Sequence, residues 1–99
     1  MAKYDVHPLK SGDGFVLDVQ AELLDHLNTR VVVPLIPRSQ APKPAQRLNP
    51  VFEIDDQQYV MMTQFLSAVL KSELGSPVAN LSDEFAEITN ALDMVFQGF

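Results

Sequence analysis

The sequence predicts a small, mainly antiparallel α+β domain, or a closed barrel, with one helix at its carboxyl end. The length of 99 residues fits a single domain with one core. Short segments rich in β-branched and aromatic residues alternate with turn-forming residues over most of the chain, which is typical of strands. The last segment instead repeats its apolar residues at spacings of three and four, which is typical of an amphipathic helix.

The first strands are expected before residue 37. Residues 4–8 alternate between apolar and polar types, and the glycine-containing stretch 11–14 follows as a hairpin turn. Segments 15–19 and 31–36 come next and both have strand composition. Pro34 lacks the N–H that a strand donates to its neighbour, so we expect the second segment to lie at an edge or to be bulged there.

Residues 37–50 contain four prolines and are expected to form a connecting loop. Segments 51–54 and 59–63 are expected to pair as a hairpin, because the polar stretch 55–58 between them has turn composition. The segment 64–71 fits either another short strand or one helical turn.

The terminal helix is expected to begin at Ser82 as its N-cap, because the carboxylates of Asp83 and Glu84 would then lie in the first turn, where the helix dipole favours negative charge. Its apolar stripe is expected to pack on the sheet. At the end of this stripe, Phe96 and Phe99 either complete the core face or present an aromatic tip to a partner. The stripe consists of Phe85, Ile88, Ala91, Leu92, Val95, Phe96 and Phe99.

Charge is distributed unevenly along the chain, whose formal net charge is −6. This charge disfavours nucleic acid as a direct partner. Nearly all bases lie in the first half, and no acid occurs between His26 and Phe52. This interval fits either a docking strip for an acidic peptide or a solvated proline-rich loop, and its bases are Arg30, Arg38, Lys43 and Arg47.

Catalytic motifs are absent from the sequence. It has no cysteine, no phosphate-binding glycine loop and no HExxH motif, and His7 and His26 are isolated from any nucleophile. Asp55 and Asp56 are expected to form a turn. No segment has the composition of a signal peptide or a membrane span, so we expect a cytoplasmic protein without a membrane partner.

Several blocks, in order and at matching spacing, make the chain similar to the CcdB toxins of bacterial toxin–antitoxin modules. The resemblance implies one domain over residues 1–99: a five-stranded antiparallel SH3-like barrel with an accessory β-sheet and a C-terminal helix. It also implies a homodimer and no cofactor. The blocks are Leu17-Asp18-Val19-Gln20, Leu23-Leu24-Asp25, Arg30 to Leu35, Tyr59 to Thr63, Leu81-Ser82 through Ile88, Asn90 to Asp93, and Phe96-Gln97-Gly98-Phe99.

The resemblance further implies a binding protein rather than an enzyme. CcdB-like toxins bind the DNA gyrase A subunit, trap the gyrase–DNA cleavage complex, and are neutralised by a CcdA-like antitoxin with a disordered arm. DNA is then contacted only through gyrase or the antitoxin. The antitoxin surface on this chain stays open. The positions that match the family's gyrase contacts are Leu23, Leu24, Asp93, Phe96, Gln97, Gly98 and Phe99.

The chain departs from the best-known family pattern at its end, where Gln97 replaces a tryptophan and Phe99 an aliphatic residue. Two alternatives to gyrase poisoning therefore remain. One is a homologue that only binds antitoxin. The other is an endoribonuclease like MazF, which shares the barrel, with Lys10, Ser11 or Arg30 acting on RNA.

Overall fold

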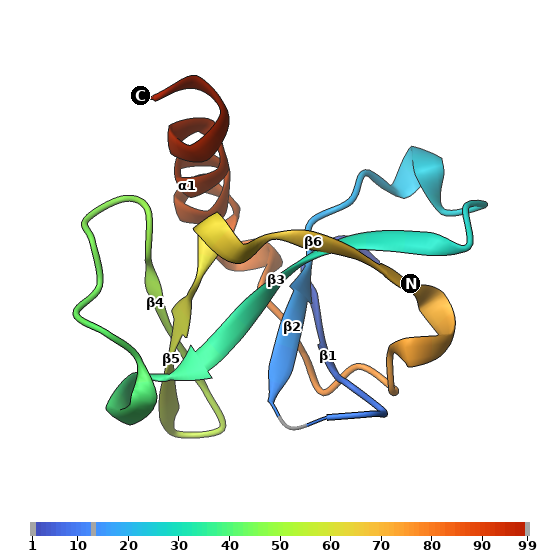
Figure 1. The fold of residues 1–99 in the computed structure, drawn as a ribbon, viewed down its shortest axis with the longest axis horizontal. Coiled ribbons are helices and arrows are strands. Elements are labelled where there is room, and N and C mark those ends of the chain that lie inside the picture. Colours follow the sequence, from blue (N-terminus) through green and yellow to red (C-terminus); the bar gives the residue numbers. More distant parts are fainter. Residues whose placement is uncertain (1, 13, 99) are drawn as a thin grey trace.

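The computed structural model describes residues 2–12 and 14–98. Its strands form one antiparallel sheet in the order β4-β5-β3-β2-β1-β7, with β6 also paired to β3 (Figure 1). The strands are β1 (Asp5–Pro8), β2 (Phe15–Asp18), β3 (Thr29–Pro37), β4 (Val51–Ile54), β5 (Gln57–Met61), β6 (Ser67–Leu70) and β7 (Ala79–Asn80).

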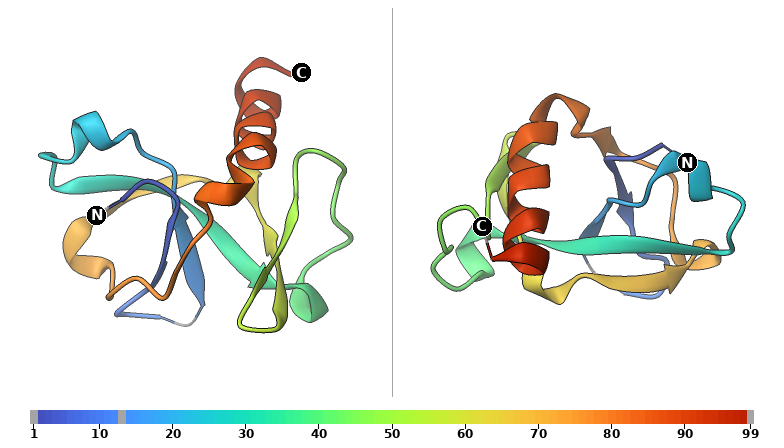
Figure 2. Two further views of the ribbon diagram at one scale, coloured as in Figure 1. Left: turned by 180° about the vertical axis from the view of Figure 1, so that it is seen from behind. Right: turned by 90° about the horizontal axis from the view of Figure 1, so that it is seen from above.

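The sheet curls into a nearly closed barrel, and the helix α1 (Phe85–Gln97) follows at the carboxyl end of the chain (Figure 2). An isolated bridge between Leu9 and Leu74 brings the end of β1 to the segment after β6 and helps to close the barrel. The expected fold class, a mainly β barrel with a C-terminal helix, is confirmed. No helix in the described part of the chain is long and apolar enough to cross a membrane.

Strand β3 organises the sheet because it has three neighbours. One edge pairs with β2 from Asp18↔Val32 to Phe15↔Leu35. The other edge pairs first with β6, up to Val32, and then with β5, from Leu35 onward. The expectation of an edge or a bulge at Pro34 is wrong, because β3 is a central strand.

Pro34 is tolerated there because it lies where the partner strand changes. Its carbonyl accepts a hydrogen bond from the Met62 amide, so the backbone of Pro34 faces the β5 and β6 edge and not β2. The Pro34 nitrogen, which carries no hydrogen, therefore faces the interval between β6 and β5. Its lack of an N–H removes no hydrogen bond to β2.

The core lies inside the barrel and is closed by α1. Inward residues of alternating strand positions, such as Val6, Leu17 and Val33, are completely buried. Helix α1 contributes Ile88 and Ala91 to the same cluster. The other face of β2 and β3 packs a smaller cluster of Val16, Val32 and Leu74.

The helix begins later than expected. Ser82 is not its N-cap: residues Ser82–Glu84 form a 3-10 turn, and α1 starts at Phe85 without a side-chain cap. The Ser82 amide donates to Asn80 Oδ1 at 2.9 Å, so Asn80 orders the entry to the turn.

The remaining segments largely follow their composition. The stretch 64–71 contains both alternatives, since a 3-10 turn η3 (Thr63–Phe65) precedes β6. Between β4 and β5, Asp55 and Asp56 have φ values of 52° and 65°, which makes the two-residue turn left-handed and suited to a hairpin.

Candidate functional site

The end of α1 carries four of the residues predicted to contact a partner. The ribbon views show this end of the helix standing clear of the barrel (Figures 1 and 2). Phe96 is 69% exposed, and Gln97 and Gly98 are exposed as well, whereas Asp93 is half-buried. Of the two interpretations offered for Phe96, the structure supports the aromatic tip. Phe99 lies outside the described residues.

Local contacts fix the geometry of this helix end. Gln97 Nε2 donates to Asp93 Oδ1 at 3.5 Å, one helical turn earlier. Gly98 ends the helix with a φ of 81° and donates its amide to the Met94 carbonyl. A left-handed C-cap of this kind favours glycine, because a side chain there meets backbone strain.

Leu23 and Leu24 lie in the 3-10 turn η1 (Glu22–Leu24) between β2 and β3. Leu23 is 88% exposed and Leu24 is 42% exposed, so the expected exposure of this pair is confirmed. No residue of η1 is buried. The turn therefore offers an apolar surface that the protein does not use for its own core.

The two groups of predicted contact residues are apart in one protomer. In both figures the turn η1, coloured light blue, and the end of α1, coloured red, lie at opposite sides of the molecule. The structure thus gathers Asp93, Phe96, Gln97 and Gly98 at one place and holds Leu23 and Leu24 at another.

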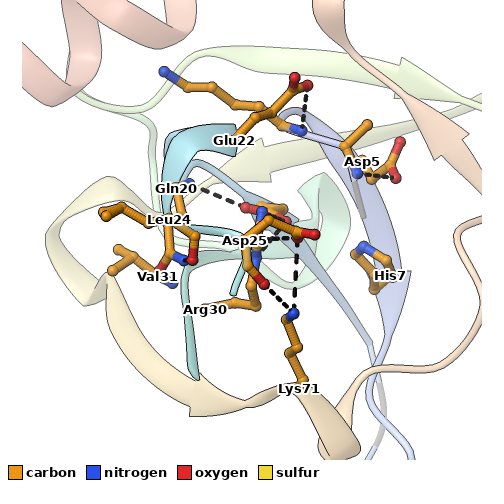
Figure 3. Close-up of polar contacts among 12 residues, drawn as sticks. Asp5, His7, Gln20, Glu22, Leu24, Asp25, Arg30, Val31 and Lys71 are labelled. Atoms are coloured by element: carbon orange, nitrogen blue, oxygen red, sulfur yellow. Dashed lines mark hydrogen bonds and ion pairs between the residues drawn. The ribbon is translucent and has the colours of Figure 1, made fainter. Parts of the chain in front are cut away.

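A buried ion pair between Arg30 and Asp18 lies beside η1. Arg30, in β3, is completely buried, and its Nε and Nη2 donate to Asp18 Oδ2 at 2.9 and 2.6 Å. Its Nη1 donates to Asp25 Oδ1 at 2.8 Å. Figure 3 shows the side chains of Arg30 and Lys71 pointing toward Asp25, which directly follows η1. The guanidinium is therefore satisfied by two carboxylates, as a buried charge requires.

Gln20 makes a second set of ties. Its Nε2 donates to the Leu24 carbonyl at 3.1 Å and the Thr29 carbonyl at 3.3 Å, while its Oε1 accepts from the Val31 amide at 3.0 Å. This one side chain, 6% exposed, joins the end of η1 to the start of β3.

The burial of Arg30 corrects two expectations. Arg30 is not part of a basic docking strip, and its completely buried side chain cannot contact RNA. The remaining bases of that interval, Arg38, Lys43 and Arg47, are exposed. The network around Arg30 was not predicted from the sequence, although the charged Asp18 at the end of an apolar strand is a signal for a buried partner.

The two histidines lie in different surroundings. His7 is buried in β1, and its Nδ1 lies 2.8 Å from the Gly75 carbonyl, to which it donates. His26 is exposed in the loop after η1. Within residues 2–12 and 14–98, no cluster of three histidine or acidic side chains could hold a metal ion.

The family model described as CcdB protein matches residues 3–98, nearly the whole chain. The chain belongs to the CcdB family. Members of this family are toxins of toxin–antitoxin systems. The blocks that carry the resemblance include Leu23 and Leu24 of η1, most of α1, and both Asp18 and Gln20.

Solved structures of similar fold include three from mycobacteria. An endoribonuclease in complex with its cognate antitoxin is 18% identical, with a TM-score of 0.77 over 97% of this CcdB chain and 94% of that chain. Toxin MazF-mt6 of Mycobacterium tuberculosis is 15% identical, with a TM-score of 0.77 over 93% and 95%. Another mycobacterial endoribonuclease is 17% identical, with a TM-score of 0.79 over 97% and 90%. At such identities the likeness concerns the fold alone.

Proposed function

We propose that this CcdB family member is a toxin that binds the DNA gyrase A subunit, traps the gyrase–DNA cleavage complex and so arrests growth. It acts as a homodimer and is neutralised by a cognate antitoxin. The observation that carries the proposal is the surface position of the matching residues: Leu23, Leu24, Phe96 and Gln97 are all exposed.

Binding without bond cleavage fits this surface. Large apolar side chains that are exposed on a folded protein supply the burial energy of an interface, at about 25 cal/mol per Å² of apolar area. Leu23, Leu24 and Phe96 are three such side chains at positions where the family contacts gyrase. No step of the proposed mechanism needs a nucleophile, a metal or a cofactor.

The alternative of an RNA-cleaving enzyme has weaker support. Of the three residues weighed for it, Arg30 is buried between two aspartates, and Ser11 Oγ donates to Glu73 Oε2 at 2.6 Å. The net charge of −6 also opposes binding to a polyanion. Incubation of the purified protein with single-stranded RNA is expected to leave the RNA intact, and cleavage that survives repurification would contradict this proposal.

A growth assay tests gyrase poisoning directly. Expression without an antitoxin is expected to stop growth and to accumulate gyrase-linked DNA breaks, and Leu23→Ala with Phe96→Ala is expected to abolish both effects. The matched control is Leu70→Ala with Phe65→Ala, because these side chains are 50% and 57% exposed but lie outside the proposed contacts. Normal growth at high expression of the native chain would refute the proposal.

Gln97 favours one further candidate, a homologue that binds antitoxin without poisoning gyrase. A tryptophan at this position combines apolar burial with a cation–π contact, whereas glutamine offers only hydrogen bonds. The two candidates differ in a pull-down experiment. A toxin is expected to bind both the gyrase A subunit and the product of a neighbouring antitoxin gene, whereas the alternative binds only the latter.

A further inference from the structure

The turn η1 has little stability of its own. It is three residues long, contains no buried residue and has no side-chain hydrogen bond at its N-cap. Isolated 3-10 turns of this length have poor hydrogen-bond geometry and open easily unless other parts of the protein hold them. The conformation that exposes Leu23 and Leu24 must therefore be maintained from outside the turn.

Among the described residues, three side chains from separate parts of the chain hold its carboxyl end. Gln20 binds the Leu24 carbonyl, and Arg30 binds the Asp25 carboxylate, as described above. The third is Lys71 of the 3-10 turn η4 (Lys71–Glu73), which lies 46 positions after Asp25 in sequence. Its Nζ donates to the Asp25 carbonyl and lies 3.8 Å from Asp25 Oδ1 (Figure 3).

Lys71 differs from the other two side chains because the barrel does not depend on it. Gln20 and Arg30 are buried, whereas the Lys71 side chain is 32% exposed and belongs to neither apolar cluster. Its backbone amide separately donates to the Asn28 carbonyl, so η4 stays beside the loop when the side chain is changed. Loss of the ammonium group removes this hydrogen bond to the Asp25 carbonyl.

We propose that Lys71 is a positioning residue for target binding, because it holds η1 in the conformation that presents Leu23 and Leu24. This inference rests on the proposed function. A partner that binds only the ordered turn has an apparent affinity reduced by the fraction of molecules in which the turn is disordered. Lys71 itself need not touch the partner.

Amide hydrogen exchange in the free protein measures this ordering. Leu24, Asp25 and Leu27 donate amides to Ala21, Glu22 and Leu24 carbonyls, so their exchange rates report whether the turn is closed. Lys71→Met is expected to open the turn in most molecules, so that these three amides lose nearly all protection and binding to the host's gyrase A subunit weakens about threefold to tenfold. Lys71→Arg, which keeps a cationic donor, is expected to restore both.

The control is Lys43→Met, which removes an exposed lysine from the loop after η2 (Arg38–Gln40) and is expected to change neither readout. A urea unfolding curve of Lys71→Met that matches the native curve separates local opening from general instability. The proposal is overturned if Lys71→Met leaves the three exchange rates unchanged. It is also overturned if the three amides lose their protection while gyrase binding stays the same.

Leu23→Ala, measured beside these variants, keeps the two proposals distinguishable. If Leu23→Ala weakens gyrase binding and Lys71→Met does not, the positioning role is wrong and the proposed function stands. If native protein does not bind gyrase at all, the proposed function fails, and the role of Lys71 in that binding fails with it.

Discussion

Arg30 is the residue on which the region around η1 depends. Its guanidinium is completely buried and makes hydrogen bonds to both Asp18 and Asp25, so it joins the end of β2, the loop after η1 and the start of β3. A buried ion pair contributes modestly when complete, but removal of one partner leaves an uncompensated charge in the interior. We therefore expect substitutions at the exposed arginines to cost little stability and substitutions of Arg30 to cost much more.

Arg30→Met is expected to lower the free energy of unfolding by about 3 to 5 kcal/mol, because the Asp18 carboxylate then stays buried without a counter-charge and keeps only the hydrogen bond from the Gln20 amide. Arg38→Met, at an exposed site, is expected to cost less than about 0.5 kcal/mol. Urea denaturation measures both. The double variant Asp18→Asn with Arg30→Met should regain part of the loss, and a double variant that is no better than Arg30→Met contradicts the explanation.

Gln97 sets the strength of the proposed gyrase contact. Gln97→Trp is expected to bind the gyrase A subunit more tightly by about 1 to 2 kcal/mol, which corresponds to roughly fivefold to thirtyfold, if an arginine of gyrase lies opposite. Titration of labelled protein with the subunit provides the measurement. Gln97→Leu adds apolar area without an aromatic ring and serves as the control, and equal gains from both would exclude the cation–π contribution.

Strand β3 and helix α1 show at the level of elements what sequence patterns can and cannot predict. Alternation and composition predicted the strands around residues 15–18 and 51–54, because each pairs with a neighbour close in sequence. The next strand was expected over 59–63, and β5 covers 57–61 because the turn before it has only two residues. Pro34 was misjudged because the exchange of β6 for β5 on one edge is a tertiary event, set by pairings with residues about 30 positions away. The start of α1 was placed too early, since a serine followed by two acids fits a 3-10 turn as well as a helix.

The C-cap of α1 provides a test at this scale. Gly98→Ala is expected to lower the free energy of unfolding by about 1 kcal/mol, because φ at this position is 81° and alanine is strained there. Gly12→Ala, at a position with open space and no positive φ, is the matched control and should be nearly neutral. Thermal unfolding followed by circular dichroism compares the two variants. Equal melting temperatures would show that the end of α1 is frayed.

Across the whole molecule, large apolar side chains are exposed at two opposite sides, on η1 and at the end of α1. Exposure of Leu23 and Leu24 could be predicted because an apolar pair between two strands in a polar loop has no place in a small core. The exposure of Phe96 could not, since periodicity alone assigns it to the same stripe as Ile88 and Ala91. Only the position of α1 on the barrel decides which part of the stripe is buried.

Phe85 and Phe96 provide a test of the proposed homodimer. They are eleven positions apart, about three helical turns, so they lie on one side of α1, and both are more than half exposed. Sedimentation equilibrium is expected to give twice the chain mass of 11.0 kDa, because a second copy would cover this side. Phe85→Glu should shift the equilibrium toward the monomer. A single 11.0 kDa species at all concentrations would contradict the homodimer.

The separation of η1 from the end of α1 also bears on how a susceptible cell could evolve resistance. If each region binds a different part of the target, the two contributions to the binding free energy are independent and nearly additive. A single substitution in the target then weakens binding to one region and leaves binding to the other unchanged. Resistance therefore needs two substitutions in the target. Only one shared residue, contacted by both regions at once, would make resistance accessible in one step.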